Sequence, residues 1–229
     1  NKIEYVINAA AKVGGILANK KFKADYLIEN LQIQNNVITS SFKYKVKSLI
    51  FLGSSCVYPR NCKQPIKERY LLTGPLEKTN EPYAIAKIAG IKLCQALRKQ
   101  YNFDAISLMP TNLYGPNDNY DFKTSHVLPA MIRKFHEAKI NNLDTVTLWG
   151  SGSPLREFLH VSDLARAIKN CLENDYKPHL LNVGSNDELS IKELALMVKK
   201  IISYKGEILW DKTKPDGTPR KRLDSSIIN

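Results

Sequence analysis

Cysteine is scarce in this sequence: four occur among 229 residues, namely Cys56, Cys62, Cys94 and Cys171. None of them forms a Cys-x-x-Cys pair, which argues against a zinc site and against a thioredoxin-like motif. Four cysteines are also too few for a disulfide scaffold. We therefore expect a reducing, cytoplasmic setting in which most of these cysteines are small buried apolar residues.

Long apolar runs and low-complexity segments are absent as well. No stretch of about 18 residues is free of charge, so the sequence predicts no transmembrane helix. The first residues lack the basic-then-apolar pattern of a secretory signal. Glycine and proline, eleven of each, are too few for a collagen-like chain. With 43% hydrophobic residues, the chain has enough apolar side chains for a sizeable globular core.

Acidic residues are fewer than basic ones: the sequence has 34 Lys and Arg but 22 Asp and Glu, which gives a net charge of +12. Such a balance fits a nucleic acid, an anionic membrane surface or a phosphate-bearing ligand, and it fits a solvated surface equally well. The basic residues are spread along the chain. No aromatic-interleaved arginine run and no zinc-finger spacing supports nucleic acid, which is therefore the most distant of the functional hypotheses.

Apolar runs alternate with helical patterns in the first half of the chain. Runs at 5–10, 48–52 and 103–109 predict buried strands, and apolar periodicity predicts helices at 25–45 and 82–101. Nearly continuous apolar strands separated by helices are typical of a parallel sheet covered on both faces, which is an α/β fold. The remaining expected elements are helices at 126–138, 161–174 (capped by Ser162 or Asp163) and 191–202, strands at 145–149, 157–160 and 179–183, and a loop-rich end.

Parallel sheets bind ligands beyond the carboxyl ends of their strands, so residues that follow the apolar runs are candidates for chemistry. Ser54 and Cys56 follow one such run, where a hydroxyl can hydrogen-bond a substrate carbonyl. Tyr83 and Lys87 share one helix face, where an ammonium lowers the pKa of a neighbouring phenol from about 10. Taken singly, each pattern is more typical of a structural role: a polar turn with a buried thiol, and an amphipathic helix.

The combination of motifs is far more specific than its parts. The chain carries AAAKVGG at 9–15, GSSCVYP at 53–59, NEPYAIAK at 80–87, MPTNLYGP at 109–116, REFLHVSD at 156–163 and KPDGTPRK at 214–221. Together these blocks resemble the extended short-chain dehydrogenase/reductase family, which uses a Ser/Thr–Tyr–Lys triad on a nicotinamide-binding Rossmann fold. The resemblance is strongest to those members of the family that epimerise GDP-4-keto-6-deoxy-mannose at C3 and C5 and reduce it at C4 with NADPH.

The resemblance implies catalytic roles for five residues. Cys56 is expected to be the base at C3 and C5, which requires nearby positive charge to bring the thiol pKa below about 8.5. His126 is expected to be the acid on the opposite face of the sugar. Tyr83 is expected to protonate the developing C4 alkoxide, Ser54 to hydrogen-bond that oxygen, and Lys87 to hold the nicotinamide ribose and tune Tyr83.

The resemblance also implies binding residues. For NADP(H) these are Leu52, Gly53, Ser54, Ser55, Tyr83, Lys87, Pro110, Thr111, Asn112, Leu113 and His126. For the GDP-sugar they are Lys134, Trp149, Arg156 and Asp216, because Arg and Lys suit a diphosphate and Trp packs on flat groups. A homodimer through helices that include 82–101 is implied, whereas a metal, a nucleic acid and a membrane partner are not expected.

One feature of the family is missing from this sequence. The Gly-x-x-Gly-x-x-Gly turn that cradles the pyrophosphate is absent, and Gly14-Gly15 lacks its spacing and follows a later strand. We therefore expect a fragment of a longer protein that opens on the family's fourth strand, has an unpaired sheet edge and is inactive by itself. Its predicted parts are a partial Rossmann domain (1–116 and 156–184) and an interleaved substrate domain (117–155 and 185–229).

Two other kinds of function stay open from the sequence. Another extended reductase, such as a nucleotide-sugar 4-epimerase or 4,6-dehydratase, would share the fold and the triad. A dehydratase is expected to carry an acidic pair in place of Ser55 and Cys56, however, and a plain 4-epimerase needs no thiol base. A non-catalytic binding protein on the same fold would explain the missing glycine turn, but the presence of Ser54, Tyr83 and Lys87 argues against it.

Overall fold

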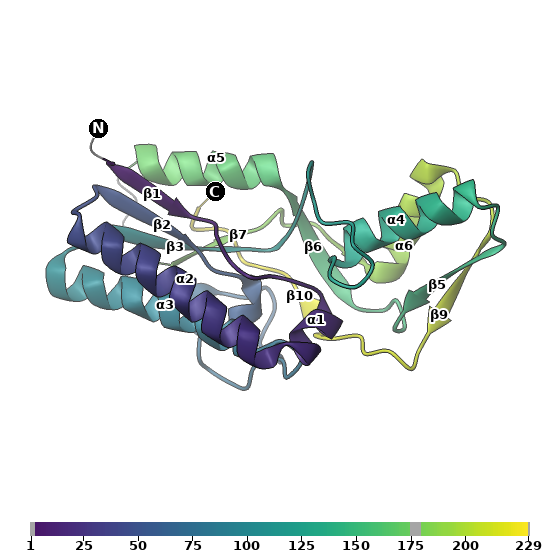
Figure 1. The fold of residues 1–229 in the computed structure, drawn as a ribbon, viewed down its shortest axis with the longest axis horizontal. Coiled ribbons are helices and arrows are strands. Elements are labelled where there is room, and N and C mark those ends of the chain that lie inside the picture. The colour runs from purple at the N-terminus through teal and green to yellow at the C-terminus, as the bar shows by residue number, and fades with distance from the viewer. Residues whose placement is uncertain (1–2, 175–179, 229) are drawn as a thin grey trace.

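Four parallel strands form the main sheet of the protein. The structure, a computed structural model, describes residues 3–174 and 180–228. The strands β1 (Tyr5–Asn8), β2 (Ser48–Leu52), β3 (Ala105–Pro110) and β7 (Leu180–Val183) lie in the order β1-β2-β3-β7, and each neighbouring pair is parallel. Figure 1 shows helices on both sides of this sheet. The expected α/β fold with a parallel sheet is confirmed.

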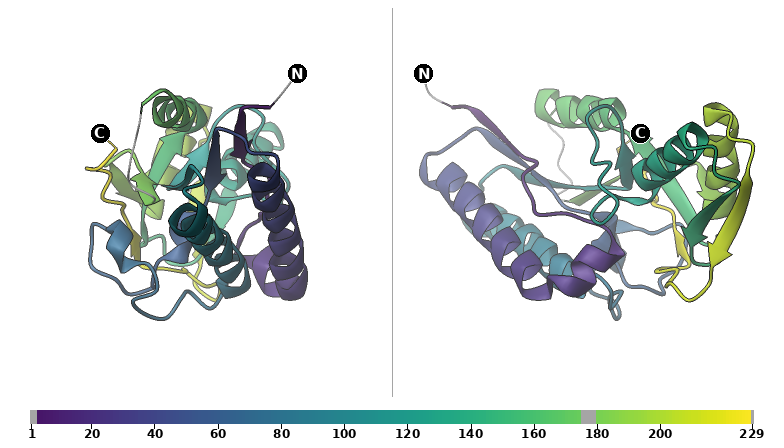
Figure 2. Two further views of the ribbon diagram at one scale, coloured as in Figure 1. Left: turned by 90° about the vertical axis from the view of Figure 1, so that its left-hand side faces the viewer. Right: turned by 45° about the vertical axis from the view of Figure 1, so that its right-hand side comes forward.

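The side chains of β2 show why an unbroken apolar run makes a central strand. Leu49 and Phe51 belong to the core under helices α2 (Lys23–Lys43) and α3 (Glu81–Tyr101). Ile50, on the opposite face, belongs to the core under helix α5 (Val161–Glu173). Successive residues of a strand point to opposite faces, so a strand buried on both sides is apolar at nearly every position; in β2 only the first residue, Ser48, is polar. Figure 2 shows α2 and α3 side by side, with α5 across the sheet from them.

The edge strand β1 is only partly covered. Tyr5 and Ile7 are each 48% exposed, and among the described residues β1 pairs with β2 alone. This agrees with the unpaired edge expected from the sequence. At the other side of the sheet, β7 pairs with β3, so the chain returns to the main sheet after β6 (Leu155–His160), as the sequence predicts.

The remaining strands build two smaller sheets. β6 pairs in parallel with β4 (Asn112–Tyr114) and β10 (Arg220–Lys221), and antiparallel with β8 (Glu188–Ser190). β5 (Thr145–Trp149) pairs in parallel with β9 (Glu207–Asp211). Helices α4 (Val127–Ile140) and α6 (Ile191–Ile202) pack around a core of their own that includes the fully buried Phe135. This core is separate from the clusters on the two faces of the main sheet, and the division into two domains stays a prediction.

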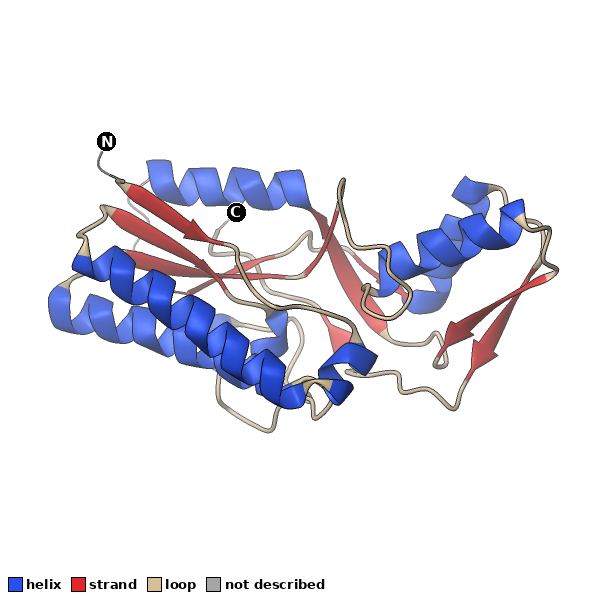
Figure 3. Ribbon diagram, in the orientation of Figure 1, coloured by secondary structure: helices blue, strands red, loops and turns tan. Residues whose placement is uncertain are grey.

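Several short elements escaped the sequence prediction (Figure 3). The end of the chain is not loop-rich throughout, because it forms β9 and β10. Five further short elements were also missed from the sequence: α1 (Ile16–Lys21), β4, β8 and the 3-10 turns η1 (Ser55–Val57) and η2 (Glu68–Tyr70). Helix α5 is not capped by Ser162 or Asp163. The imidazole Nδ1 of His160 accepts the backbone N–H of Ser162 at 3.2 Å instead. His179, expected to begin a strand, lies outside the described residues.

A buried carboxylate connects β6 to the segment that begins with β10, which we call the strap (residues 220–225). Glu157 is fully buried. Its Oε1 accepts the backbone N–H of Asn186 at 2.6 Å, and its Oε2 accepts that of Leu223 at 3.0 Å. Burial raises the pKa of Glu157 above its usual range, while these hydrogen bonds oppose the rise. Both oxygens are therefore committed to backbone donors from distant parts of the chain.

Replacement of Glu157 by Gln tests this connection. An amide has one acceptor oxygen instead of two, so one backbone N–H loses its partner, and we expect the free energy of unfolding to fall by about 1–3 kcal/mol. Urea denaturation followed by tryptophan fluorescence measures the change. Glu137→Gln, which removes a surface ion pair with Arg133, is the matched control and should cost at most about 1 kcal/mol. Equal losses in the two variants would contradict the role given to Glu157.

Candidate active site

The segments that follow β2 and β3 meet at one edge of the main sheet. Leu52 is paired with Leu108, and the backbone N–H of Gly53 donates to the carbonyl of Leu108 at 2.8 Å. A Cβ atom at position 53 would overlap the side chain of Met109, so glycine permits this close approach. At the same edge, Asn8 ends β1 with both amide atoms buried and without hydrogen-bond partners among the described residues.

The turn η1 sets Ser54 and Cys56 beside helix α3. The hydroxyl of Ser54 begins the turn by accepting the backbone N–H of Cys56 at 3.2 Å. The same hydroxyl lies close enough to the phenol of Tyr83 to stabilise its phenolate. Tyr83 stands in the first turn of α3, just after Pro82. A hydroxyl, a thiol and a phenol from two distant segments are thereby brought together.

The phenol of Tyr83 has a raised pKa in this structure, which contradicts the lowering expected from Lys87. Burial is the largest cause, and negative charge on Cys56 adds to it, whereas Ser54 acts in the opposite direction. Lys87 does not counter these effects, because its ammonium donates to the carbonyl of Leu52 at 2.8 Å. The shared helix face was predicted correctly, but the lysine side chain is directed at the end of β2.

Lys87 is a buried cation at the carboxyl end of the sheet. The residue is only 3% exposed, and its Nζ lies 5.0 Å from the ring centroid of Phe51. Burial lowers the pKa of Lys87 to about 8. An ammonium carries three donor hydrogens, and one of them is taken by the carbonyl of Leu52.

The thiol of Cys56 is surrounded by positive charge. The Nζ of Lys221, on β10, donates to its sulfur at 3.3 Å, and Arg156 on β6 acts from farther away. Burial is the largest single influence and raises the pKa of Cys56, but Lys221, Ser54 and Arg156 together outweigh it, so the net shift is downward. The positive charge that the sequence analysis required is thus present. Lys221 was missed as a site residue, although it ends the motif at 214–221.

His126 is the residue just before α4, and its side chain makes no capping hydrogen bond to the helix. Solvent reaches this residue. Surrounding protein atoms lower the pKa of His126 by desolvation, Asp118 opposes this, and the positive charge of Lys221 lowers it further. One ammonium therefore acts on both the thiol of Cys56 and the imidazole of His126.

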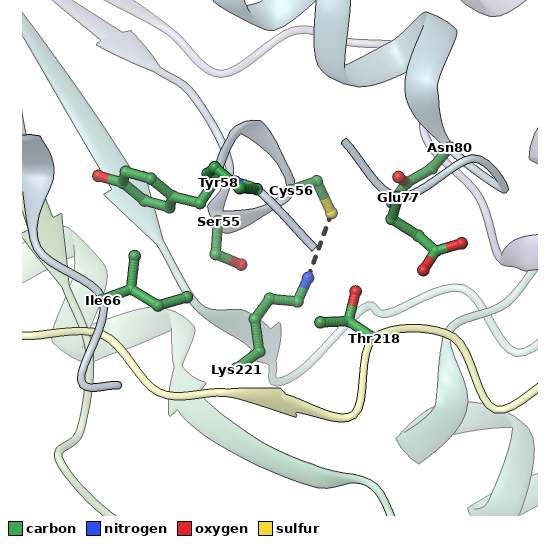
Figure 4. A pocket seen from close by; sticks show the side chains of 9 residues that line it. Ser55, Cys56, Tyr58, Ile66, Glu77, Asn80, Thr218 and Lys221 are labelled. Carbon is green, nitrogen blue, oxygen red and sulfur yellow. Dashed lines mark hydrogen bonds between the residues drawn. The ribbon is translucent and has the colours of Figure 1, made fainter. Parts of the chain in front are cut away.

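A small pocket adjoins the thiol. It is lined by Ser55, Cys56, Tyr58, Pro59, Ile66, Glu77, Asn80, Thr218 and Lys221. In Figure 4 the side chains of Cys56 and Lys221 point toward each other, with Glu77, Asn80 and Thr218 nearby. The Oδ1 atom of Asn80 is buried without a hydrogen-bond partner among the described residues. The pocket thus offers polar groups together with a thiol.

The residues expected to hold the GDP-sugar form two pairs. The ammonium of Lys134 lies 5.2 Å from the ring centroid of Trp149, which is 43% exposed. The guanidinium of Arg156 acts electrostatically on both Cys56 and Asp216. Asp216 in turn accepts two hydrogen bonds from Ser151, at 2.7 and 2.8 Å. Arg156 is therefore the member of this group that lies nearest to the candidate catalytic residues.

Thr111 and Asn112, which follow β3, both hydrogen-bond to β6. The hydroxyl of Thr111 donates to the carbonyl of Glu157 at 3.1 Å, and the amide of Asn112 donates to the same carbonyl at 2.8 Å. Pro110 ends β3, and Leu113 lies in β4. In this structure Thr111 and Asn112 thus hold β6 next to the end of β3, and their role toward a cofactor stays a prediction.

Comparison with known proteins gives consistent similarities. The model of the NAD dependent epimerase/dehydratase family matches residues 1–184. GDP-L-fucose synthase 1 of Arabidopsis thaliana is 60% identical over 224 residues, covering 98% of this chain and 69% of the relative. GDP-L-fucose synthase of Escherichia coli (strain K12) is 51% identical over 237 residues, covering 100% and 74%.

Solved structures of similar proteins have the same architecture. A GDP-L-fucose synthetase from Naegleria fowleri bound to NADP superposes with a TM-score of 0.86 at 31% identity, covering 97% of this chain and 69% of that one. A GDP-mannoheptose C4 reductase from Campylobacter jejuni with NADP bound gives 0.87 at 39% identity, covering 98% and 74%. The chain belongs to the NAD dependent epimerase/dehydratase family.

Proposed function

We propose that this protein is an NADP-dependent enzyme that epimerises GDP-4-keto-6-deoxy-D-mannose at C3 and C5 and then reduces C4, giving GDP-L-fucose. The main observation behind the proposal is that the thiol of Cys56, which contacts the ammonium of Lys221 in a pocket, lies close to the hydroxyl of Ser54 and the phenol of Tyr83. Identities of 51% and 60% to GDP-L-fucose synthases support the same activity. Similarity to enzymes over nearly the whole chain also weighs against a non-catalytic binding protein.

The carboxyl edge of the main sheet fits a dinucleotide cofactor. Asn8 presents two buried amide atoms without partners there, and Lys87 presents a buried ammonium that has donor capacity beyond its bond to Leu52. Lys87 and the residues after β2 would hold the nicotinamide ribose, and residues 110–113 would lie along the cofactor. When bound, NADPH supplies the hydride for C4.

Epimerisation follows from the acidity that a ketone gives to its neighbouring carbons. The 4-keto group acidifies the protons on C3 and C5, so the Cys56 thiolate takes a proton from one face of the sugar. His126 returns a proton to the other face, and the configuration at that carbon is inverted. Its lowered pKa makes the imidazolium of His126 a stronger acid. A plain 4-epimerase has no step that uses this thiol.

Reduction uses Tyr83 and Ser54, which lie near Cys56. As C4 is reduced, its oxygen becomes an alkoxide that needs a proton. Tyr83 donates the proton, and Ser54 hydrogen-bonds the same oxygen. Burial raises the pKa of Tyr83, which keeps the phenol protonated and ready to donate at neutral pH.

The remaining parts of the proposal concern the GDP moiety and the setting of the enzyme. Lys134 and Arg156 would bind the diphosphate, Trp149 would pack on a flat group, and Asp216 would complete the site. Across the described ranges, no helix combines the length and apolarity needed to cross a membrane. We also propose a cytoplasmic homodimer without nucleic-acid or membrane partners, on the sequence arguments given above.

Replacement of Cys56 by Ser should block epimerisation before reduction. A serine hydroxyl does not form an anion near neutral pH, so exchange of the C3 and C5 protons should slow by a factor on the order of 100 or more. Mass spectrometry of GDP-4-keto-6-deoxy-D-mannose incubated with the full-length protein in D2O, without NADPH, measures the exchange. Cys62→Ser, at another half-buried cysteine, should leave it unchanged. Normal exchange in the Cys56 variant would show that another group is the base.

Replacement of Tyr83 by Phe should separate the two half-reactions. Without the phenolic proton, NADPH oxidation should fall by a factor on the order of 100 or more, while deuterium exchange at C3 and C5 continues. Absorbance at the NADPH band and mass spectrometry follow the two steps. Tyr101→Phe, at the exposed end of α3, is the control. Undiminished NADPH oxidation by Tyr83→Phe would remove Tyr83 from the reduction step.

A further inference from the structure

We propose that Lys221 is a positioning residue that holds Cys56 as a thiolate through direct contact between its ammonium and the sulfur. The inference rests on the proposed function for its catalytic meaning. It assigns the activation of the base that removes the protons at C3 and C5 to a residue outside the predicted triad.

The contact itself is direct and local. The Nζ of Lys221 lies 3.3 Å from the sulfur of Cys56, and both side chains line the same pocket (Figure 4). A thiolate is the stronger base and nucleophile, and a neighbouring ammonium stabilises it. Because the sulfur is largely withdrawn from water, bulk solvent stabilises the anion poorly. The neighbouring cation therefore matters more here than it would at an exposed site.

The strap fixes the position of Lys221 on both sides. Before it, the carbonyl of Arg220 accepts the amide N–H of Gln64 at 3.2 Å; after it, the backbone N–H of Arg222 donates to Oε1 of Gln64 at 3.0 Å. The carbonyl of Arg222 accepts from the backbone N–H of Ile66 at 2.7 Å. Next along the strap, Leu223 is held by Glu157. The lysine thus projects from a backbone that is bonded on either side.

The other charged and titratable groups near the sulfur do not replace this lysine. Arg156 favours the thiolate without a direct contact, and Tyr83, whose phenol interacts with Ser54, carries no positive charge. Glu77, which also lines the pocket, forms an ion pair with Arg60 at 3.1 Å. His126 is also titratable; the charge of Lys221 lowers its pKa, and His126 is not among the groups that act on the sulfur. Lys221 is therefore the cation in direct contact with the thiol.

The pH dependence of thiol alkylation tests the proposal without any assay of activity. Iodoacetamide reacts with the thiolate, so the rate at Cys56, followed by mass spectrometry of its peptide from about pH 5 to about pH 10, reports the thiol pKa. Removal of the ammonium by Lys221→Met destabilises the thiolate and raises that pKa. We expect alkylation at about pH 7 to slow by a factor on the order of 10 and the profile to move to higher pH.

Three further variants make the result specific. Lys221→Arg retains the charge and should restore most of the alkylation rate. Lys212→Met removes an equal charge from an exposed position and should leave the profile unchanged. Lys221→Gln provides a second neutral replacement if the Met variant does not fold, with circular dichroism as the check. Deuterium exchange at C3 and C5 in the full-length protein, measured against pH, should move in the same direction as alkylation.

The two proposals fail in different ways. If the neutral variants at position 221 keep the alkylation profile of the parent protein, Lys221 does not stabilise the thiolate and the inference is overturned. If alkylation shifts as expected but GDP-4-keto-6-deoxy-D-mannose exchanges no protons with the parent protein, the ion pair stands and the proposed function is wrong. If Lys221→Arg behaves like Lys221→Met, side-chain packing, and not charge, explains the effect.

Discussion

The buried carboxylate of Glu157 is the contact on which the arrangement of the site depends. It sits on β6, and its two oxygens accept backbone donors from the loop after β7 and from the strap. A carboxylate withdrawn from water is costly unless hydrogen bonds replace the lost hydration, so the segments that supply these donors are held firmly. The hydroxyl of Thr111 and the amide of Asn112 bond the carbonyl of the same residue. Position 157 thus joins the main sheet, the smaller sheet and the strap.

The consequence for chemistry is that a lysine from the strap reaches a thiol from the main sheet. Cys56 follows β2, and Lys221 lies in β10, which pairs with β6 beside Arg156. Each group taken alone would be unremarkable: burial alone would raise the thiol pKa, and a lysine on a short edge strand would be solvated. Together with Ser54 and Arg156, Lys221 outweighs burial, so the pKa of the thiol is lowered. The electrostatic character of the site therefore depends on the contact between the segment after β2 and the strap.

Local sequence was a good guide where a residue pattern is sufficient to define an element. The run at 48–52 coincides with β2, and the patterns at 145–149 and 191–202 coincide with β5 and α6, because burial on fixed faces demands a regular apolar spacing. β9 and β10 were missed because they are short and their pairing partners are far away in the chain. For the site, motifs predicted Ser54, Cys56 and Tyr83, the family resemblance added His126, and their catalytic roles stay predictions. The lowering of the Tyr83 pKa expected from Lys87 was wrong, because the pKa of the buried phenol is raised.

The sequence by itself determined the order of strands and helices, the parallel character of the main sheet and the residue types available for proton transfer. These depend on apolar periodicity and on motifs of a few adjacent residues. The tertiary structure decided which charges face which groups. Lys221 and Cys56 are separated by 165 positions along the chain, and no local pattern contains their 3.3 Å contact. A pKa responds to distance and to burial, and both exist only once the chain has folded.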